Sequence, residues 1–573
     1  MKIVFKEKMV YVLLFLIVIL FKCSNLLIYN FPWAGDSTLM LSGGMWFAGY
    51  DWSNYAAHGS YYGFFYPMLL SPLMRFIDEP VLLYKSMLLV NNIIVGGIAL
   101  GIYYLAHERC KMCNWSSISA VMLFLVFEPI CRYSDFILSE VPFMLWTLWA
   151  IIIMSKLTDT KKKNAMTLLL AIVLPLGLLI HSRCLIVYIG LLITAIVYHI
   201  VYKKSLVNYL ILILIGSVEA YFINIAINYI QKAVWLSGKE VLTNSTEAMA
   251  GRISIIQHLT DLDKIKQFIV VVLSNISNYI YLSFGVFALA LVTIFLLLRY
   301  YRSDIKANRS LFIILLTGIL CWLGMIFSQC LISFEGVYNG DAKWLVYSRY
   351  GAPFVFLIYI CMAYYLEKCE LHKMQMVLLT LFVDCAAGVF FIRVLCGHLV
   401  GKDIHQTTLF NPLLTTVREY SNVMVMEKQY LYETIFLFLI LTLVSIWILY
   451  KNKKMYYVVF CFLCSVLFYI RITDCWKELC DGQYKAVSAS VEIAREMSNV
   501  DDENIVVIGS GTYIAEIRYG LYNRKIDIVT TTEELTISSD MIVFSSEMYD
   551  ELNEGYWIFI DDRQYAYTMS DAV

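Results

Sequence analysis

The sequence is poor in charge and in proline. Only 16% of its 573 residues are charged and nine are prolines, whereas 60% are hydrophobic and the mean hydropathy is +0.69. A soluble globular chain is about 45–50% apolar and about 25% charged, so an ordinary core cannot hide this much apolar surface from water. The net charge of −1 gives no sign of a nucleic acid or another polyanion as partner. These deficits exclude a soluble enzyme, a nucleic-acid binder and a disordered scaffold.

Long uncharged runs recur along the chain, and each has about the length that crosses a bilayer as a helix. Continuous runs also exclude an outer-membrane barrel, whose strands alternate apolar and polar residues. We therefore predict a polytopic α-helical membrane protein. Its thirteen expected helices span 9–29, 81–106, 116–131, 137–155, 165–181, 184–202, 206–230, 268–298, 310–333, 351–366, 374–395, 431–450 and 455–472. The first is interpreted as an uncleaved helix, because no small-x-small cleavage site follows it.

Lysine and arginine gather in alternate loops between these helices. Under the positive-inside rule such loops are cytoplasmic. They are the loops around residues 2–8, 109–111, 156–163, 203–204, 299–309, 368–373 and 451–454. We expect a multi-pass protein of the cell membrane with its N-terminus in the cytoplasm and, after thirteen crossings, its C-terminus outside. The long outer segments would be 30–80, 231–267, 334–350, 396–430 and 473–573.

Two domains are expected. Residues 1–472 form the transmembrane domain, whose first extracytoplasmic loop, 30–80, has two stretches apolar enough to lie on the membrane surface as amphipathic helices, 38–49 and 64–76. Residues 473–573 alternate short β-branched runs with helical patterns, which predicts a small extracytoplasmic α/β domain. The strands are expected at 504–508, 526–529, 541–544 and 557–560, and the helices near 484–497 and 512–522.

The first outer loop holds the candidate acid–base groups. Asp36 follows the first helix, and a carboxylate near the hydrocarbon boundary has a raised pKa and can act as a general base. The alternative is that Asp36 begins the next helix as its cap. Asp51 and His58 are further acid–base candidates, or else solvated loop residues. Aromatic rings such as Tyr62 suit stacking on a sugar, or belong to the interfacial belt of the membrane.

Four short motifs follow one another, all on the predicted outer face. Each is unspecific alone, and their order carries the signal. They are Asp36 with the aromatic, proline-containing stretch 61–72; the segment 129–143, which has Pro129 and Leu138-Ser139-Glu140; His181-Ser182-Arg183; and Tyr347-Ser348-Arg349-Tyr350 with Pro353.

Over residues 1–370 this order resembles the GT-C superfamily of membrane glycosyltransferases, in particular the family 39-like bacterial protein O-mannosyltransferases and aminoarabinose transferases. The resemblance implies an inverting transferase that moves a sugar from a polyprenyl-phosphate donor to a cell-surface glycan, lipid or protein acceptor on the outer face of the membrane. It implies Asp36 as the catalytic base. The implied substrate-binding residues are Glu140, Arg183, Arg349, Tyr350, Asp51, His58 and Tyr62.

Arginine grips phosphate through paired hydrogen bonds, so Arg183 and Arg349 are expected at the donor phosphate. The alternative is an ordinary arginine that reaches out to the interface from a helix end. Glu140 would orient Asp36 or a sugar hydroxyl, or else be a buried partner for Arg132 or Arg183. The family often has two adjacent acids where Ser37 follows Asp36 here, so we expect no cofactor and a site without a metal ion.

Two other functions remain open from the sequence. A flippase or other transporter would use ionisable groups within the membrane, and Glu219 and Asp384 lie inside apolar runs. A polysaccharide polymerase or ligase would rely on the late outer loop 396–430, which contains His405 and Arg418. Lys22, near the outer end of the first helix, is expected to extend to the membrane surface.

Overall fold

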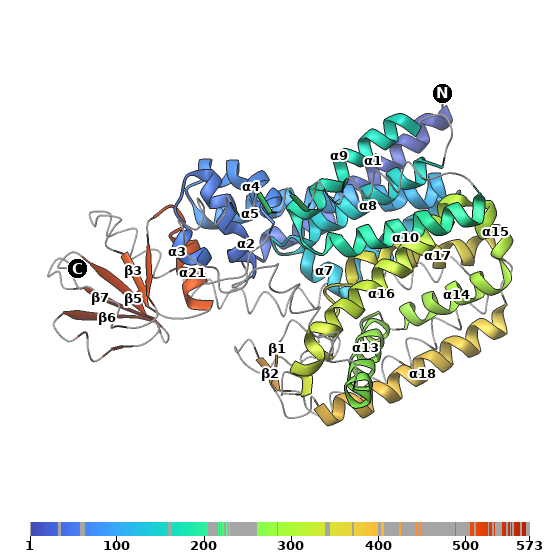
Figure 1. The fold of residues 1–573 in the computed structure, drawn as a ribbon. Helices are drawn as coiled ribbons and strands as arrows, with labels where there is room; N and C mark the ends of the chain where they lie inside the picture. The colour runs from blue at the N-terminus through green and yellow to red at the C-terminus, as the bar shows by residue number, and fades with distance from the viewer. Residues whose placement is uncertain are drawn as a thin grey trace.

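The computed structural model describes residues 2–32, 36–57, 63–158, 163–203 and, with short gaps, 261–398. Towards the C-terminus it describes chiefly 403–405, 423–425, 505–508, 512–529, 541–549 and 555–568. A helical bundle makes up most of this part, and a small sheet lies beside one end of it (Figure 1). The predicted helices 206–230, 431–450 and 455–472 and the helix expected near 484–497 fall mostly outside the described residues.

Eight helices of the bundle lie where helices are predicted, seven of them to within five residues at each end; α1 begins and ends seven residues before its predicted range 9–29. In the part of the chain described, five helices are long and apolar enough to cross a membrane and four more are shorter and apolar. The matching helices are α1 (Lys2–Lys22), α5 (Pro80–Tyr104), α8 (Glu140–Lys156), α9 (Lys163–Ile180), α10 (Cys184–Tyr202), α16 (Arg309–Tyr338), α17 (Val355–Lys368) and α18 (Lys373–His398).

Two predicted helices are each broken in two, so these predictions were wrong in detail. The run 116–131 forms α6 (Asn114–Leu125) and α7 (Glu128–Ser134), and the run 268–298 forms α13 (Leu262–Leu282) and α14 (Val286–Tyr300). Gly285 stands at the second break with φ +78°, a left-handed conformation that costs glycine little. The Ser283 hydroxyl, two residues before the N-cap Gly285, accepts a hydrogen bond from the Phe287 amide at 2.9 Å and so satisfies one N–H of the first turn of α14.

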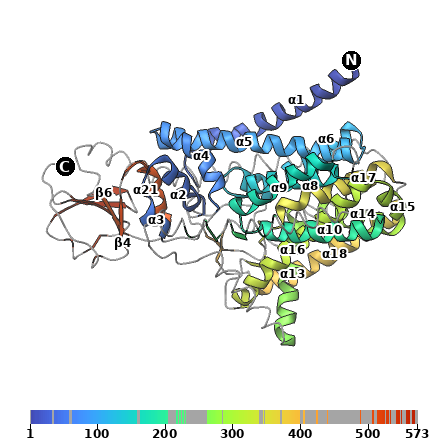
Figure 2. The same ribbon diagram turned by 45° about the horizontal axis from the view of Figure 1, so that its top comes forward.

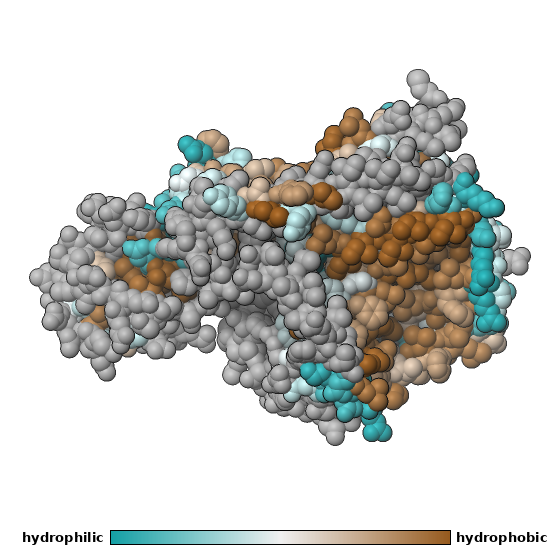
Figure 3. Space-filling view, viewed as in Figure 1, coloured by the Kyte–Doolittle hydropathy of each residue, from teal (hydrophilic) through white to brown (hydrophobic). Residues whose placement is uncertain are grey.

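α1 lies at the edge of the bundle against α5 and extends beyond its neighbours (Figure 2). Val12, Leu16 and Leu20 along it are about half exposed or more, as expected of side chains that face lipid. On the face shown in Figure 3, a hydrophobic area covers the region of α10 and α16, and a hydrophilic strip borders it where α15 (Arg302–Ala307) lies. This pattern agrees with a bundle that is embedded in the membrane and has one end exposed to water.

Three of the loops predicted to be cytoplasmic, those at 109–111, 156–163 and 299–309, have described residues that come together at one end of the bundle. The Arg109 guanidinium donates to the Ser155 carbonyl at 2.5 Å, and the Asn308 amide donates to the Cys110 carbonyl at 3.2 Å. We call this end, where Arg109, Lys111, Lys156 and Arg309 lie, the basic end. Glu140 begins α8 and Lys156 ends it, so the predicted site lies at the opposite end.

The first outer loop forms a helix at each of the two stretches predicted, and their place on the membrane surface stays a prediction. The two helices are α2 (Asp36–Ala48) and α4 (Phe65–Phe76), with the short α3 (Ser53–Ala57) between them. α2 packs directly on α4: a Cβ at Gly44 would lie 2.7 Å from the Pro67 carbonyl oxygen, so no larger residue fits there without a shift.

The C-terminal sheet has five strands in the order β4-β3-β5-β7-β6. β3 (Ile505–Ile508) is parallel to β4 (Asp527–Val529) and β5 (Ile542–Ser545); β7 (Gln564–Thr568) is antiparallel to β5 and to β6 (Tyr556–Asp561). Four strands and α21 (Thr512–Gly520) occur where predicted, and β7 was not predicted. That residues 473–573 form a separate α/β domain remains a prediction.

The sheet and the first outer loop are packed together. α2, α3 and α21 lie between the sheet and the bundle in both views (Figures 1 and 2). The Trp52 indole donates to the Tyr522 carbonyl at 2.9 Å, and the Tyr519 hydroxyl donates to the Pro80 carbonyl at 3.2 Å. A second, two-stranded sheet pairs β1 (Asp403–His405) with β2 (Val423–Val425) in the loop 396–430.

Candidate functional site

Three of the predicted site residues form one buried ion cluster. Glu140 begins α8, Arg183 stands just before α10, and Arg349 precedes the 3-10 turn Ala352–Phe354 that leads into α17. One oxygen of Glu140, Oε1, accepts hydrogen bonds from Arg349 Nε at 2.5 Å and from Arg183 Nη2 at 3.1 Å. The exposed fractions of the three residues are 1%, 6% and 6%. We call this group the arginine cluster.

The arginine cluster carries more positive than negative charge. One carboxylate faces two guanidinium groups, which leaves a net charge of about +1 in a place where charge is expensive to bury. Glu140 Oε2 and Arg183 Nη1 are buried and have no hydrogen-bond partner among the described residues. Among the described residues, the cluster thus has an unused N–H donor and two guanidinium groups for one carboxylate, which together favour an anionic ligand.

Aromatic rings hold both guanidinium groups in place. The Arg183 Cζ atom lies 3.7 Å from the centre of the Tyr350 ring, and Arg349 Cζ lies 5.3 Å from that of Tyr133. The turn before α17 is anchored as well, because the Tyr279 hydroxyl donates to the Ser348 carbonyl at 2.6 Å. Sequence reasoning missed Tyr133 and Tyr279, which look like ordinary aromatic residues of apolar runs.

A second buried charge pair lies nearby in the fold and was not predicted. Lys22 is fully buried and forms an ion pair with Asp135, so the prediction that Lys22 extends to the membrane surface was wrong. The Asn25 amide also donates to Asp135, at 3.2 Å, and the side chains of Asn25 and Asn92 donate to each other. Lys22 stays inside because Asp135 supplies a countercharge at the same depth.

Polar contacts connect this pair to the first outer loop. The Asn91 amide donates to the Ser134 carbonyl at 2.7 Å, and its oxygen accepts from the Tyr66 hydroxyl at 3.0 Å. Gly63 lies against the end of α9, since a Cβ there would be 2.3 Å from the Ile180 carbonyl oxygen. The segment just before α4 therefore contacts Ile180, which lies three residues before Arg183 in the sequence.

The predicted acid–base groups are described only in part. Asp36 is the first residue of α2, and its side chain lies outside the described residues, as do His58 and Tyr62. Asp51 is exposed, and its Oδ1 accepts from the Ser53 amide at 2.9 Å at the start of α3. That contact is structural, and a role of Asp51 in substrate binding stays a prediction.

The residues of the rival functions are described only in part. Asp384 is buried in α18, and His405 lies in β1. Glu219, Arg418 and the side chain of Arg132 fall outside the described residues. Within the described ranges, no three histidine, cysteine or carboxylate side chains come close enough to hold a metal ion.

Comparison with known proteins shows which solved structures have a similar fold. No family model matches the sequence, and no curated protein matches it. Two crystal structures of ArnT from Cupriavidus metallidurans do match in fold. The form bound to undecaprenyl phosphate gives a TM-score of 0.55 at 10% identity over 98% of each chain, and the apo form 0.56 at 10% over 97% of each. The chain has the fold of ArnT, an aminoarabinose transferase of the GT-C family, as the sequence resemblance predicted.

Proposed function

We propose that this protein is an inverting glycosyltransferase that takes a sugar from a polyprenyl-phosphate donor. The observation that carries the proposal is the arginine cluster, with its net positive charge and the unpartnered Arg183 Nη1. The ArnT-like fold over nearly the whole chain supports it, since one of the matching ArnT structures holds undecaprenyl phosphate.

At the donor phosphate, Arg183 and Arg349 bind the phosphodiester and stabilise the leaving group. When the bond between the sugar C1 and the phosphate oxygen breaks, the oxygen keeps the electron pair and the phosphate gains a second negative charge. Fixed cations in a buried site stabilise this charge most in the transition state. Glu140 holds both arginines in position through a single oxygen, and Tyr350 holds the plane of Arg183.

On the acceptor side, Asp36 is the proposed base. It removes the proton from the acceptor hydroxyl while the hydroxyl oxygen attacks C1 from the face opposite the phosphate, which inverts the anomeric centre. Asp51, His58 and Tyr62 of the same loop are proposed contacts for the sugar or the acceptor. The step balances without a metal ion, and we propose that none takes part.

The acceptor is a glycan, a glycolipid or a protein on the outer face of the membrane. The positive-inside rule orients the basic end to the cytoplasm and the arginine cluster outward, with the C-terminus outside. The C-terminal sheet packs on the first outer loop through Trp52 and Tyr522, so it stands on the side proposed for the acceptor.

The test measures binding of undecaprenyl phosphate to the full-length protein in detergent. Binding is detected as a change in the unfolding temperature of the protein. We expect the lipid phosphate to raise that temperature, and Arg349→Gln to weaken apparent binding about tenfold or more. Arg349→Lys keeps the charge and should retain part of the binding, while Arg302→Gln at the basic end should bind as the unmodified protein does. No binding to the unmodified protein, or equal binding by Arg349→Gln, contradicts the proposal.

A further inference from the structure

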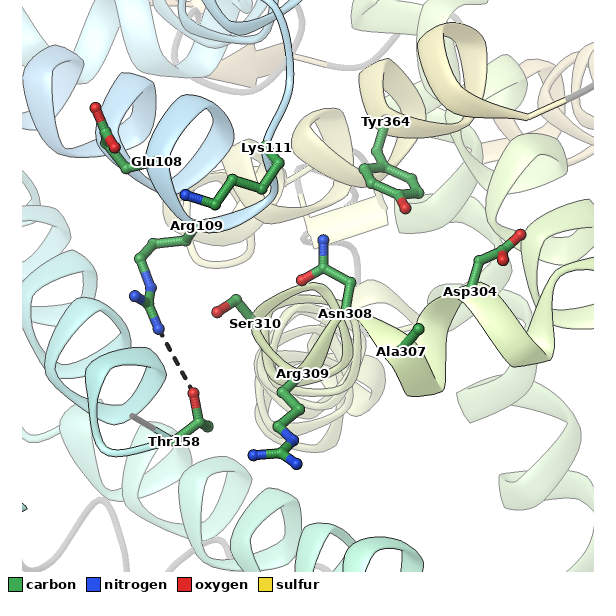
Figure 4. A pocket seen from close by; sticks show the side chains of 10 residues that line it. All are labelled: Glu108, Arg109, Lys111, Thr158, Asp304, Ala307, Asn308, Arg309, Ser310 and Tyr364. Carbon is green, nitrogen blue, oxygen red and sulfur yellow. Dashed lines mark hydrogen bonds between the residues drawn. The ribbon is translucent and has the colours of Figure 1, made fainter. Parts of the chain in front are cut away.

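A cavity of about 470 Å³ lies at the basic end of the bundle, far from the arginine cluster along α8. Lys111, Asp304 and Ala307 on its rim are exposed, so the cavity opens to the surface. Its volume falls in the range of small-molecule sites. Figure 4 shows the lining residues, which are Glu108, Arg109, Lys111, Thr158, Asp304, Ala307, Asn308, Arg309, Ser310 and Tyr364.

Positive charge is concentrated on one side of this cavity. Arg109 and Lys111 come from the turn after α5 and Arg309 comes from the start of α16, and in Figure 4 all three lie on the Ser310 side of the cavity. The Glu108 carboxylate is directed away from Ser310, and Asp304 lies on the far side of Asn308. Among the ten lining residues, the cations thus lie on the Ser310 side of the cavity and the two carboxylates lie farther from Ser310.

The backbone that presents two of these cations is unusual. Leu105–Arg109 forms a π-helical turn, with the Cys110 amide donating to the Leu105 carbonyl at 2.9 Å. Lys111 follows with φ +60°, which is uncommon for a residue other than glycine. π-Helical turns occur frequently at functional sites. Arg109 is also fixed from the other side, because Nη2 donates to the Ser155 carbonyl.

The third cation is held by the start of a long helix. Arg309 begins α16, and the Asn308 side chain caps it by accepting from the Leu311 amide at 3.1 Å. The Arg309 guanidinium carbon lies 5.7 Å from the centre of the Tyr202 ring. The first turn of a helix carries partial positive charge, which adds to that of the side chains.

We propose that this cavity binds a phosphate group. Arginine and lysine side chains bind phosphate through their N–H groups, and Ser310 and Thr158 add hydroxyl groups near these cations. The phosphate belongs either to the head group of an anionic phospholipid in the adjoining leaflet or to a soluble phosphorylated compound. The site is separate from the proposed transfer reaction, and it stands whether or not that proposal holds.

The experiment uses the full-length protein in detergent and two probes. One is inorganic phosphate, compared with chloride at equal ionic strength and read from the unfolding temperature. The other is phosphatidylglycerol, compared with phosphatidylcholine and read as bound lipid by native mass spectrometry. The variant Lys111→Asn/Arg309→Gln removes two cavity cations, and asparagine tolerates the left-handed backbone at position 111. The matched control, Arg302→Gln/Lys306→Gln, removes two exposed cations of the neighbouring α15 that do not line the cavity.

We expect the cavity variant to weaken apparent binding of at least one probe about tenfold or more, and the control to change it less than about twofold. Loss confined to phosphatidylglycerol identifies a lipid head group, and loss that includes inorganic phosphate identifies a soluble ligand. The proposal is overturned if neither probe binds the unmodified protein, a result that does not depend on the folding of any variant. It is also overturned if cavity variant and control lose binding equally.

Discussion

The guanidinium carbon of Arg183 lies 3.7 Å from the centre of the Tyr350 ring, although 167 positions separate the two residues in the sequence. Arg349, the residue before Tyr350, shares the carboxylate of Glu140 with Arg183. One short turn before α17 thus supplies both a cation for the cluster and the ring that orients the other cation. The packing of α8, α10 and α17 brings these side chains together.

Replacing Tyr350 tests this arrangement. Tyr350→Phe keeps a ring over Arg183, so binding of undecaprenyl phosphate should change less than about threefold. Tyr350→Leu removes the cation–π contact, worth about 0.5–2 kcal/mol, and should weaken binding several-fold. Equilibrium titration of both variants, with unfolding temperature as a check on integrity, distinguishes them. Equal binding by the two variants would show that the ring does not orient Arg183 toward a ligand.

Replacing Asp36 tests the proposed base. Asp36→Asn should lower sugar transfer from an undecaprenyl-phosphate donor about 10²–10⁴-fold, the usual contribution of a general base, and leave binding of undecaprenyl phosphate intact. Asp384→Asn, in α18, serves as the comparison, because a transporter would depend on such a group within the membrane. Transfer is measured in membranes as release of undecaprenyl phosphate. Full transfer by Asp36→Asn, with activity lost in Asp384→Asn, would favour the transporter instead.

The members of the arginine cluster were named as site residues through the resemblance to the GT-C superfamily, and each lies in a short polar motif at the end of an apolar run. A charged residue at such a place is visible in the sequence, and three of them at one predicted membrane face suggest a common site. The contact between Arg183 and Tyr350 was not predictable, since Tyr350 resembles any interfacial tyrosine.

The wrong predictions from the sequence concern features that a local pattern does not reveal. The environment of Lys22 depends on Asp135, which is 113 positions away, and no local pattern links them. The break between α13 and α14 leaves no mark in hydropathy, because both sides are apolar and glycine is tolerated in membrane helices. Hydropathy measures the free energy of transfer from water and says little about the path of the backbone.

The pair of Lys22 and Asp135 makes a prediction about stability. Lys22→Met leaves a buried carboxylate without its cation, which should cost about 3–5 kcal/mol of folding free energy. The double variant Lys22→Met/Asp135→Asn removes both charges and should recover most of that loss. Lys8→Met, on the same helix at an exposed position, is the matched control and should change little. The unfolding temperatures of the three variants and the unmodified protein, measured in the same detergent, rank their stabilities. A double variant no more stable than Lys22→Met would contradict the account of the pair.

Arg518 makes the last prediction, which concerns the contact between the C-terminal sheet and the first outer loop. Burial lowers the pKa of Arg518 to about 9, so the charged form depends on its hydrogen bonds. It donates to the carbonyls of Asp51 at 2.6 Å, Leu521 at 3.1 Å and Arg524 at 2.9 Å.

Arg518→Met removes the bond to the Asp51 carbonyl, which crosses the contact, and the bonds to Leu521 and Arg524, which lie within the C-terminal part. Loss of the crossing bond should weaken the contact by about 1.5–3 kcal/mol. We expect faster amide hydrogen exchange in α21 and α3, with α8 and α16 unchanged. Asn54→Ala, which removes an exposed hydrogen bond to Asp527 in the same contact, should have a much smaller effect because water replaces that bond. Unchanged exchange in Arg518→Met would mean that the sheet is held to the first outer loop by its apolar contacts, such as that between Phe31 and Tyr519, and not by this guanidinium.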